Sequence, residues 1–245
     1  MRPRRLTAIL FSRPAIGLSV FLWLCGHLGA VPLGAVPLQD LAEWFRTEKR
    51  AARYTEVRSD LERVVQEAQD EGLPAAILVE RVREGAAKAV RPEALRDAVS
   101  EELERLRQVS RVLQEAGIAE SARVPEVYRT LLLCLRAGLH PETLREVLLA
   151  DAGPPDPPDR AVASCETLLK LTSTTALEES ERRRLGVSLV SSRLPTRGYT
   201  SIPSVFARGR SGGLTDREIA DIIVLVLDGG GGIIQISEEL ERRVR

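Results

Sequence analysis

The sequence predicts a mainly α-helical fold, an irregular array of antiparallel amphipathic helices, on the strength of three observations. Aromatic residues make up only 4% of the 245 residues, so the core must be built from aliphatic side chains and alanine. Strong helix formers such as Glu and Arg accompany those side chains, which favours helices over a β-sandwich. Apolar residues also recur at helical spacing, with proline and glycine marking the segment ends.

The first 35 residues have the pattern of a signal peptide. Residues 1–13 are basic, residues 15–24 are apolar or small, and the small residues that follow offer cleavage after Ala30 or Ala35. The alternative is an uncleaved N-terminal anchor, because the only ionisable side chain between residues 15 and 38 is that of His27. We therefore expect a periplasmic or secreted protein, or one anchored in the inner membrane with its domain outside the cytoplasm.

The charge balance narrows the classes of partner. The chain carries 35 basic and 35 acidic residues, but four arginines and no acid lie in residues 1–35, which leaves 31 basic against 35 acidic groups. Such a mildly acidic chain argues against a nucleic-acid partner, since nucleic-acid-binding proteins concentrate basic residues on one face. We expect contact with a membrane only if the N-terminal segment is not cleaved.

Periodicity and helix-end signals give the elements in order. They predict helices over residues 39–53, 59–70, 74–88, 92–116, 124–137, 141–150, 160–171, 176–190 and 215–227. The clearest helix is 92–116, which Pro92 opens and Gly117 ends. Two other starts match the capping box, in which a hydroxyl and a carboxylate satisfy backbone donors: Ser59 with Glu62, and Thr215 with Glu218.

Tight corners between helices recur along the chain. Each has a small residue, an aliphatic residue after it and a second aliphatic residue six positions after the small one: Gly72-Leu73, Ala89-Val90, Gly138-Leu139 and Gly213-Leu214. This pattern is typical of a helix that ends in a left-handed residue. The intervals between corners are unequal, so a repeat-derived superhelix remains an alternative to an irregular array.

One stretch has a resemblance. Residues 71–95 (EGLPAAILVERVREGAAKAVRPEAL) resemble a run in uncharacterised exported bacterial helical proteins, where a Gly-Leu-Pro corner precedes a helix with an Arg-Val-x-Glu-Gly element. The resemblance covers residues 61–117 and consists of helix punctuation. It implies an exported helical protein and no activity.

Proline and glycine predict how the chain is divided. Residues 151–159 (DAGPPDPPD) contain four prolines and should form a semi-stiff spacer. We therefore expect two halves, a helical domain over residues 36–150 and a C-terminal helical region over residues 160–245. Within the second half, residues 191–213 are rich in Gly, Pro, Ser and Arg, which predicts a long loop.

Candidate catalytic residues are few. His140 is the only histidine after the leader, and its position before Pro141 is that of a helix cap. Together with two cysteines it cannot supply a typical zinc site, so we expect neither metal nor cofactor. The acids Asp216, Glu218, Asp221 and Asp228 could act as an acid–base pair, or form the solvated face of a helix and its N-terminal charges.

Three further features have alternative interpretations. Cys134 and Cys165 either form a disulfide outside the cytoplasm or are buried small residues. Glycines 229–232 lack the Lys-Ser/Thr pair of a phosphate loop, so residues 222–236 form either a helix that ends in glycines or a hairpin. Four arginines of the expected loop either bind an anion or are isolated surface residues: Arg193, Arg197, Arg208 and Arg210.

These observations predict an exported cell-envelope protein that acts as a non-catalytic binding or scaffolding module, with another envelope protein as its partner. Two alternatives remain. One is a carboxylate-dependent hydrolase acting on an envelope polymer, and the other is a membrane-anchored organiser of the envelope.

Overall fold

The computed structural model describes residues 37–118, 124–151 and 159–245. These residues are mainly helical and contain no strand, which confirms the predicted fold class. The expected signal peptide or anchor and residues 152–158 of the expected spacer lie outside the described residues. None of the helices in the described ranges is long and apolar enough to cross a membrane.

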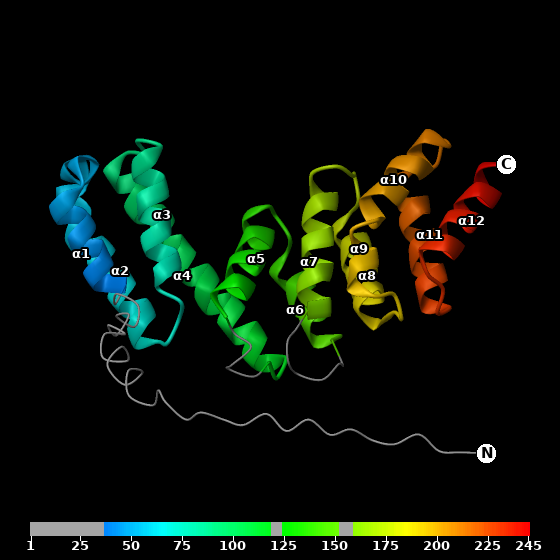
Figure 1. Cartoon of the computed structure of the whole chain (residues 1–245), viewed down its shortest axis with the longest axis horizontal. Coiled ribbons are helices and arrows are strands. Elements are labelled where there is room, and N and C mark those ends of the chain that lie inside the picture. The colour runs from blue at the N-terminus through cyan, green and yellow to red at the C-terminus, as the bar shows by residue number, and fades with distance from the viewer. Residues whose placement is uncertain (1–36, 119–123, 152–158) are drawn as a thin grey trace, which may run out of the picture. The chain divides into compact units, whose positions relative to one another are not determined.

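The helices pack mainly on partners that are near in sequence (Figure 1). The N-terminal elements are α1 (Pro37–Thr47), the 3₁₀-helix η1 (Lys49–Val57), α2 (Arg58–Asp70), α3 (Ala76–Ala87), α4 (Pro92–Glu115), α5 (Pro125–Arg136) and α6 (Pro141–Leu149). The C-terminal elements are α7 (Asp159–Thr172), α8 (Glu179–Ser191), α9 (Thr196–Tyr199), α10 (Ile202–Ser211), α11 (Asp216–Asp228) and α12 (Ile233–Val244).

The hydrophobic core passes without a break between the two expected halves. α5 packs against α7, and α6 packs against both α7 and α8. Residues Pro37–Arg245 accordingly form one compact unit. The helices on either side of residues 152–158 are therefore joined by direct packing as well as by the chain.

All four predicted corners are present. Gly72, Ala89, Gly138 and Gly213 have φ angles of 68°, 53°, 91° and 89°, in the left-handed region. The amide after each one donates to a carbonyl five residues earlier, as Leu73 N does to Ala68 O at 2.8 Å. This bond and its companion define the Schellman motif. The same bonds occur at Gly117 and Gly230, so the corners are more numerous than the sequence pattern predicted.

The prediction of one helix over residues 39–53 is wrong after residue 47. α1 ends at Thr47, and the 3₁₀-helix η1 follows it. Ala51, Tyr54 and Val57 are buried at a spacing of three, which matches the three residues per turn of a 3₁₀-helix. The Tyr54 hydroxyl also donates to Val90 O at 2.8 Å. Tertiary burial therefore selects the tighter helix.

The capping box expected at Ser59 and Glu62 does not form. η1 continues directly into α2, so this helix has no free first turn for a hydroxyl to cap. Glu62 instead accepts a hydrogen bond from Arg58 Nε at 2.7 Å. The other predicted capping box, Thr215 with Glu218, is present at the start of α11.

The long loop expected over residues 191–213 is also wrong, because α9 and α10 occupy most of it. Its prolines stand where a helix tolerates them, Pro195 as N-cap of α9 and Pro203 in the first turn of α10. Gly209 allows α10 to approach α11 closely, since a Cβ there would lie 2.6 Å from side-chain atoms of Ile219. These residues serve helix packing rather than a loop.

Residues 222–236 are helical, so the hairpin alternative is wrong. α11 ends at Asp228, the chain turns at Gly230 with φ 78°, and α12 begins at Ile233. Ile236 and Leu240 of α12 are buried, in keeping with its packing on α10 and α11. The run of glycines is therefore a corner between two helices.

Candidate functional site

Two of the four candidate acids serve the N-terminus of α11. Asp216 accepts a hydrogen bond from Ala176 N at 2.8 Å and lies 3.7 Å from Arg210 Nη1. Glu218 accepts hydrogen bonds from the backbone amide and hydroxyl of Thr215, each at 2.8 Å, and these bonds lower the pKa of the Glu218 carboxyl. Both carboxylates thus hold the corner that leads into α11.

The other two acids connect α11 to α8. Asp221 forms an ion pair with Arg184, and Asp228 accepts a hydrogen bond from Ser188 Oγ at 2.7 Å. Among the described residues no group of three or more His, Cys, Asp and Glu side chains is placed to hold a metal ion. Two of the four acids thus lie at the N-terminus of α11, and the other two lie at the contact between α11 and α8.

His140 caps a helix. Its Nδ1 accepts a hydrogen bond from Glu142 N at 3.3 Å, at the first turn of α6. Its backbone amide donates to Glu179 Oε1 at 3.2 Å. The residue thus has the capping role expected from its position before Pro141.

The four candidate arginines do not converge. Arg193 and Arg197 precede α10, whereas Arg208 and Arg210 lie in its last turn. Because a ten-residue helix rises about 15 Å, α10 separates the two pairs of arginines. Arg208 donates to Ser237 Oγ at 3.3 Å, and Arg210 donates to Thr174 O. The side chains of Arg193 and Arg197 are exposed and form no hydrogen bond or ion pair with the described residues.

Cys134 and Cys165 are both free and buried in the structure. The Cys134 thiol donates to the backbone oxygen of Cys165 at 3.4 Å. Burial raises the pKa of the Cys134 thiol to about 12 and that of Cys165 well above its usual range. Each thiol is therefore protonated and shielded while the protein is folded.

Arg160 has a role that the sequence analysis missed. Its guanidinium donates to four carbonyl oxygens, those of Val190, Leu194 and Leu189 at 2.9, 3.1 and 3.2 Å and that of Ser192. It also lies 5.7 Å from the ring centre of Tyr199. Positive charge is favourable beside the last carbonyls of a helix, such as those of Leu189 and Val190 in α8. An arginine in the first turn of α7 gives no local signal of this long-range contact.

A buried ion pair was also missed. Glu102 of α4 is fully buried and accepts two hydrogen bonds from Arg136 of α5, with Nε 2.9 Å from Oε2. A sequence signal exists, because Glu102 stands three residues after Val99 and four before Leu106, on the apolar stripe of the helix. The pair fixes Arg136 at the edge of a groove.

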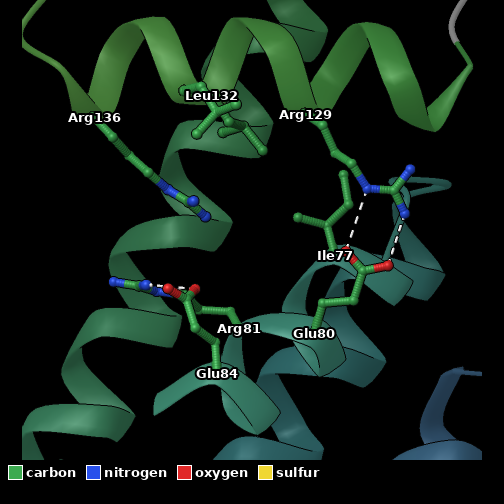
Figure 2. A pocket seen from close by; sticks show the side chains of 8 residues that line it. Ile77, Glu80, Arg81, Glu84, Arg129, Leu132 and Arg136 are labelled. Atoms are coloured by element: carbon green, nitrogen blue, oxygen red, sulfur yellow. Dashed lines mark hydrogen bonds and ion pairs between the residues drawn. The ribbon is translucent and has the colours of Figure 1, made fainter. Parts of the chain in front are cut away.

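That groove lies between α3 and α5, which both pack on α4, and has a volume of about 250 Å³ (Figure 2). Its lining combines three aliphatic side chains, three arginines and two glutamates: Ile77, Leu132, Leu133, Arg81, Arg129, Arg136, Glu80 and Glu84. We call it the α3–α5 groove. None of these residues was a candidate from the sequence, because 49 residues separate Glu80 from Arg129, which pair across it.

The α3–α5 groove joins an apolar surface to fixed guanidinium groups. Leu133 is 50% exposed, although neighbouring leucines of α5 are buried. Arg129 Nη2 donates to Glu80 Oε1 at 2.7 Å, and Arg129 and Arg136 stand on the same face of α5 as Leu132 and Leu133. Such an arrangement can take an aliphatic side chain that has a polar or anionic group beside it.

A second groove is polar and its charges are matched. It has a volume of about 450 Å³ and lies between α6, α8 and α11. Arg183 Nη1 lies 3.2 Å from Glu146 Oε1 across it. In the α3–α5 groove a larger share of the accessible lining surface is apolar than in this second groove.

Comparisons with models of protein families, with curated proteins and with solved structures found no match. The resemblance of residues 61–117 to exported helical proteins therefore stays an expectation.

Proposed function

We propose that the protein is an exported cell-envelope protein that acts as a non-catalytic binding or scaffolding module and binds a segment of a protein partner in the α3–α5 groove. The observation that carries this proposal is Leu133, a half-exposed leucine held between two arginines that are fixed by carboxylates of other helices. Apolar contact flanked by directional charge is typical of a specific protein-binding surface.

Preorganisation supports a binding role. Arg129 is held by Glu80 of α3, and Arg136 is held by the buried Glu102 of α4. A long side chain that is already ordered loses less conformational freedom when a partner binds, and this favours affinity. The groove thus offers charged groups without most of their usual entropic cost.

The free donor of Arg136 indicates the chemistry of the partner. Its Nε and Nη2 are used by Glu102, while its Nη1 makes no hydrogen bond with the described residues. Arginine carries five N–H donors and favours carboxylate acceptors. We therefore expect the bound segment to place an aliphatic side chain against Ile77 and Leu133 and an Asp or Glu carboxylate near Arg136.

Site-specific photo-crosslinking tests this groove. A photoreactive amino acid replaces Leu133 in the full-length protein, expressed in a Gram-negative host, and a matched variant carries it at Leu149, which is 42% exposed and lines neither groove. We expect a discrete adduct from position 133 alone, to a segment with an acidic residue beside an aliphatic one. Equal adducts at both positions, or an adduct segment that lacks an acidic residue, would contradict the proposed groove.

A separate measurement tests export. The N-terminal sequence and intact mass of the expressed protein give its first residue, and we expect Val31 or Val36 in the periplasmic fraction. An intact Met1 that stays with membranes in high salt and alkali would favour the anchored alternative instead. An intact Met1 in the cytosol would contradict both versions.

A further inference from the structure

The two buried thiols lie at the contact between α5 and α7, one of the closest helix pairs of the structure. Both side chains are completely buried, and the sulfur of Cys134 is 3.4 Å from the backbone oxygen of Cys165. One sulfur is therefore already in contact with the residue that carries the other. A disulfide requires Cα atoms roughly 4.4–6.8 Å apart and Cβ atoms about 4 Å apart, and the packing of α5 on α7 brings the two cysteines side by side.

We propose that Cys134 and Cys165 are joined by a disulfide in the exported protein, and that this bond fastens α5 to α7. This proposal rests on one part of the proposed function, the export of the protein, because disulfides persist outside the cytoplasm and are rare within it. It goes beyond that function by assigning a covalent link to two residues that take no part in the α3–α5 groove.

The chemistry is thiol–disulfide exchange with a small-molecule disulfide as oxidant. The thiolate of one cysteine attacks a sulfur of the oxidant, forms a mixed disulfide and releases one thiol. The second thiolate then attacks the protein sulfur of the mixed disulfide and releases the second thiol. The two cysteine thiols lose two protons and two electrons, and the oxidant is reduced to two thiols.

Burial sets the order of events. In the folded protein the thiols are shielded and their high pKa values leave few thiolates to react. Exchange therefore takes place before α5 and α7 close upon each other, and the finished bond is then protected. The same burial makes the bond slow to reduce in the native protein.

The position of the bond gives it a large effect on stability. It closes a loop of 31 positions that includes residues 152–158, and loops of this length lose substantial entropy from the unfolded chain when cross-linked. The expected gain is a shift of roughly several-hundred-fold in the folding equilibrium constant.

The test begins with the full-length chain, reduced and denatured, then refolded in a mixture of reduced and oxidised glutathione. After alkylation of free thiols and digestion with trypsin, we expect residues 130–136 (TLLLCLR) linked to residues 161–170 (AVASCETLLK) as the main form of both peptides. Cys25 falls in a different tryptic peptide, so its reactions are distinguished by mass. Recovery of both peptides chiefly in alkylated form would overturn the proposal.

Stability gives an independent readout. Urea unfolding of the oxidised protein should have a higher midpoint than that of the reduced protein. In a Cys134→Ala, Cys165→Ala double variant the midpoint should not respond to reductant. Identical midpoints for the oxidised and reduced wild-type protein would contradict the stabilising cross-link. These experiments use purified protein and so do not depend on where the protein is located in the cell. If the bond forms in vitro but the N-terminal measurement shows a cytosolic chain, the proposed export is refuted and the pairing of the two cysteines stands.

Discussion

Glu102 of α4 and Arg136 of α5 form a two-point ion pair in which the carboxylate is fully buried. Arg105 Nη1 also approaches this carboxylate, at 3.5 Å. A buried charge is tolerated in a protein interior when it is paired and hydrogen-bonded. The pair therefore joins two helices and at the same time fixes one wall of the α3–α5 groove.

Breaking this pair from one side should be costly. In Arg136→Met the carboxylate of Glu102 stays buried with only a weak partner, so we expect the free energy of unfolding to fall by about 3 kcal/mol. The double variant Glu102→Leu, Arg136→Met removes the stranded charge and should recover most of that loss. Urea denaturation measures both, and equal stability of the two variants would show that burial of the charge is not the cause.

Arg160 should be the main support of the corner after α8. Arg160→Met removes four hydrogen bonds to carbonyl oxygens while keeping most of the side-chain volume, so we expect the free energy of unfolding to fall by about 3 kcal/mol. Arg197→Met is the control, because the Arg197 side chain is exposed and has no hydrogen-bond or ion-pair partner among the described residues. It should change stability by no more than about 0.5 kcal/mol. A similar loss in both variants would contradict the proposed role.

Ala89 offers a stabilising substitution. It adopts a φ of 53°, which is costly for a residue with a Cβ, and its side chain is exposed. Ala89→Gly should therefore raise the free energy of unfolding by about 0.5 kcal/mol, the relief of strain exceeding the added freedom of the unfolded chain. The reverse change, Gly72→Ala, meets no atom within 4 Å and should lower it by about 1 kcal/mol through the backbone alone. Thermal unfolding tests both: the melting temperature should rise for Ala89→Gly and fall for Gly72→Ala.

Glu179 should contribute to the loss of stability in acid. Burial raises the pKa of this carboxyl, but hydrogen bonds from Thr143 and Arg182 outweigh burial and the net pKa is lowered. A lowered folded-state pKa gives stability that is present above the unfolded pKa, near 4.3, and is lost as pH falls through the folded pKa. Glu179→Gln should therefore show a smaller drop in unfolding free energy between pH 7 and pH 3 than the wild type. An unchanged drop would assign the acid sensitivity to other carboxylates.

The sequence predicted the fold best where its signals are local. Prolines at Pro92 and Pro141 and the capping box at Thr215 each start a helix as expected, because a cap or an N1 proline acts within one turn. The corners at Gly72 and Gly138 were predictable for the same reason. Elements decided by tertiary burial were missed, such as η1, whose three-residue spacing has meaning only once Tyr54 has a core to enter.

The candidate site depends on contacts that no local pattern encodes. Arg129 and Arg136 have the spacing of any amphipathic helix, and their role follows from Glu80 and Glu102 on other helices. The acids Asp216 and Asp221 were predicted as helix-face and N-terminal charges or as catalytic groups, and their partners Ala176 and Arg184 lie about 40 residues earlier. Sequence spacing alone could not choose between these roles.

The short-range packing of the helices has a consequence for motion. Each helix packs mainly on helices that are close to it in the order of the chain. A group of neighbouring helices can therefore fold or unfold without rearrangement of distant segments. Opening should therefore proceed in small cooperative units, with the terminal helix α12 exchanging its amide hydrogens earlier than α7 and α8, which have packed neighbours on both sides. Chain ends would loosen and re-form many times during the lifetime of the central helices.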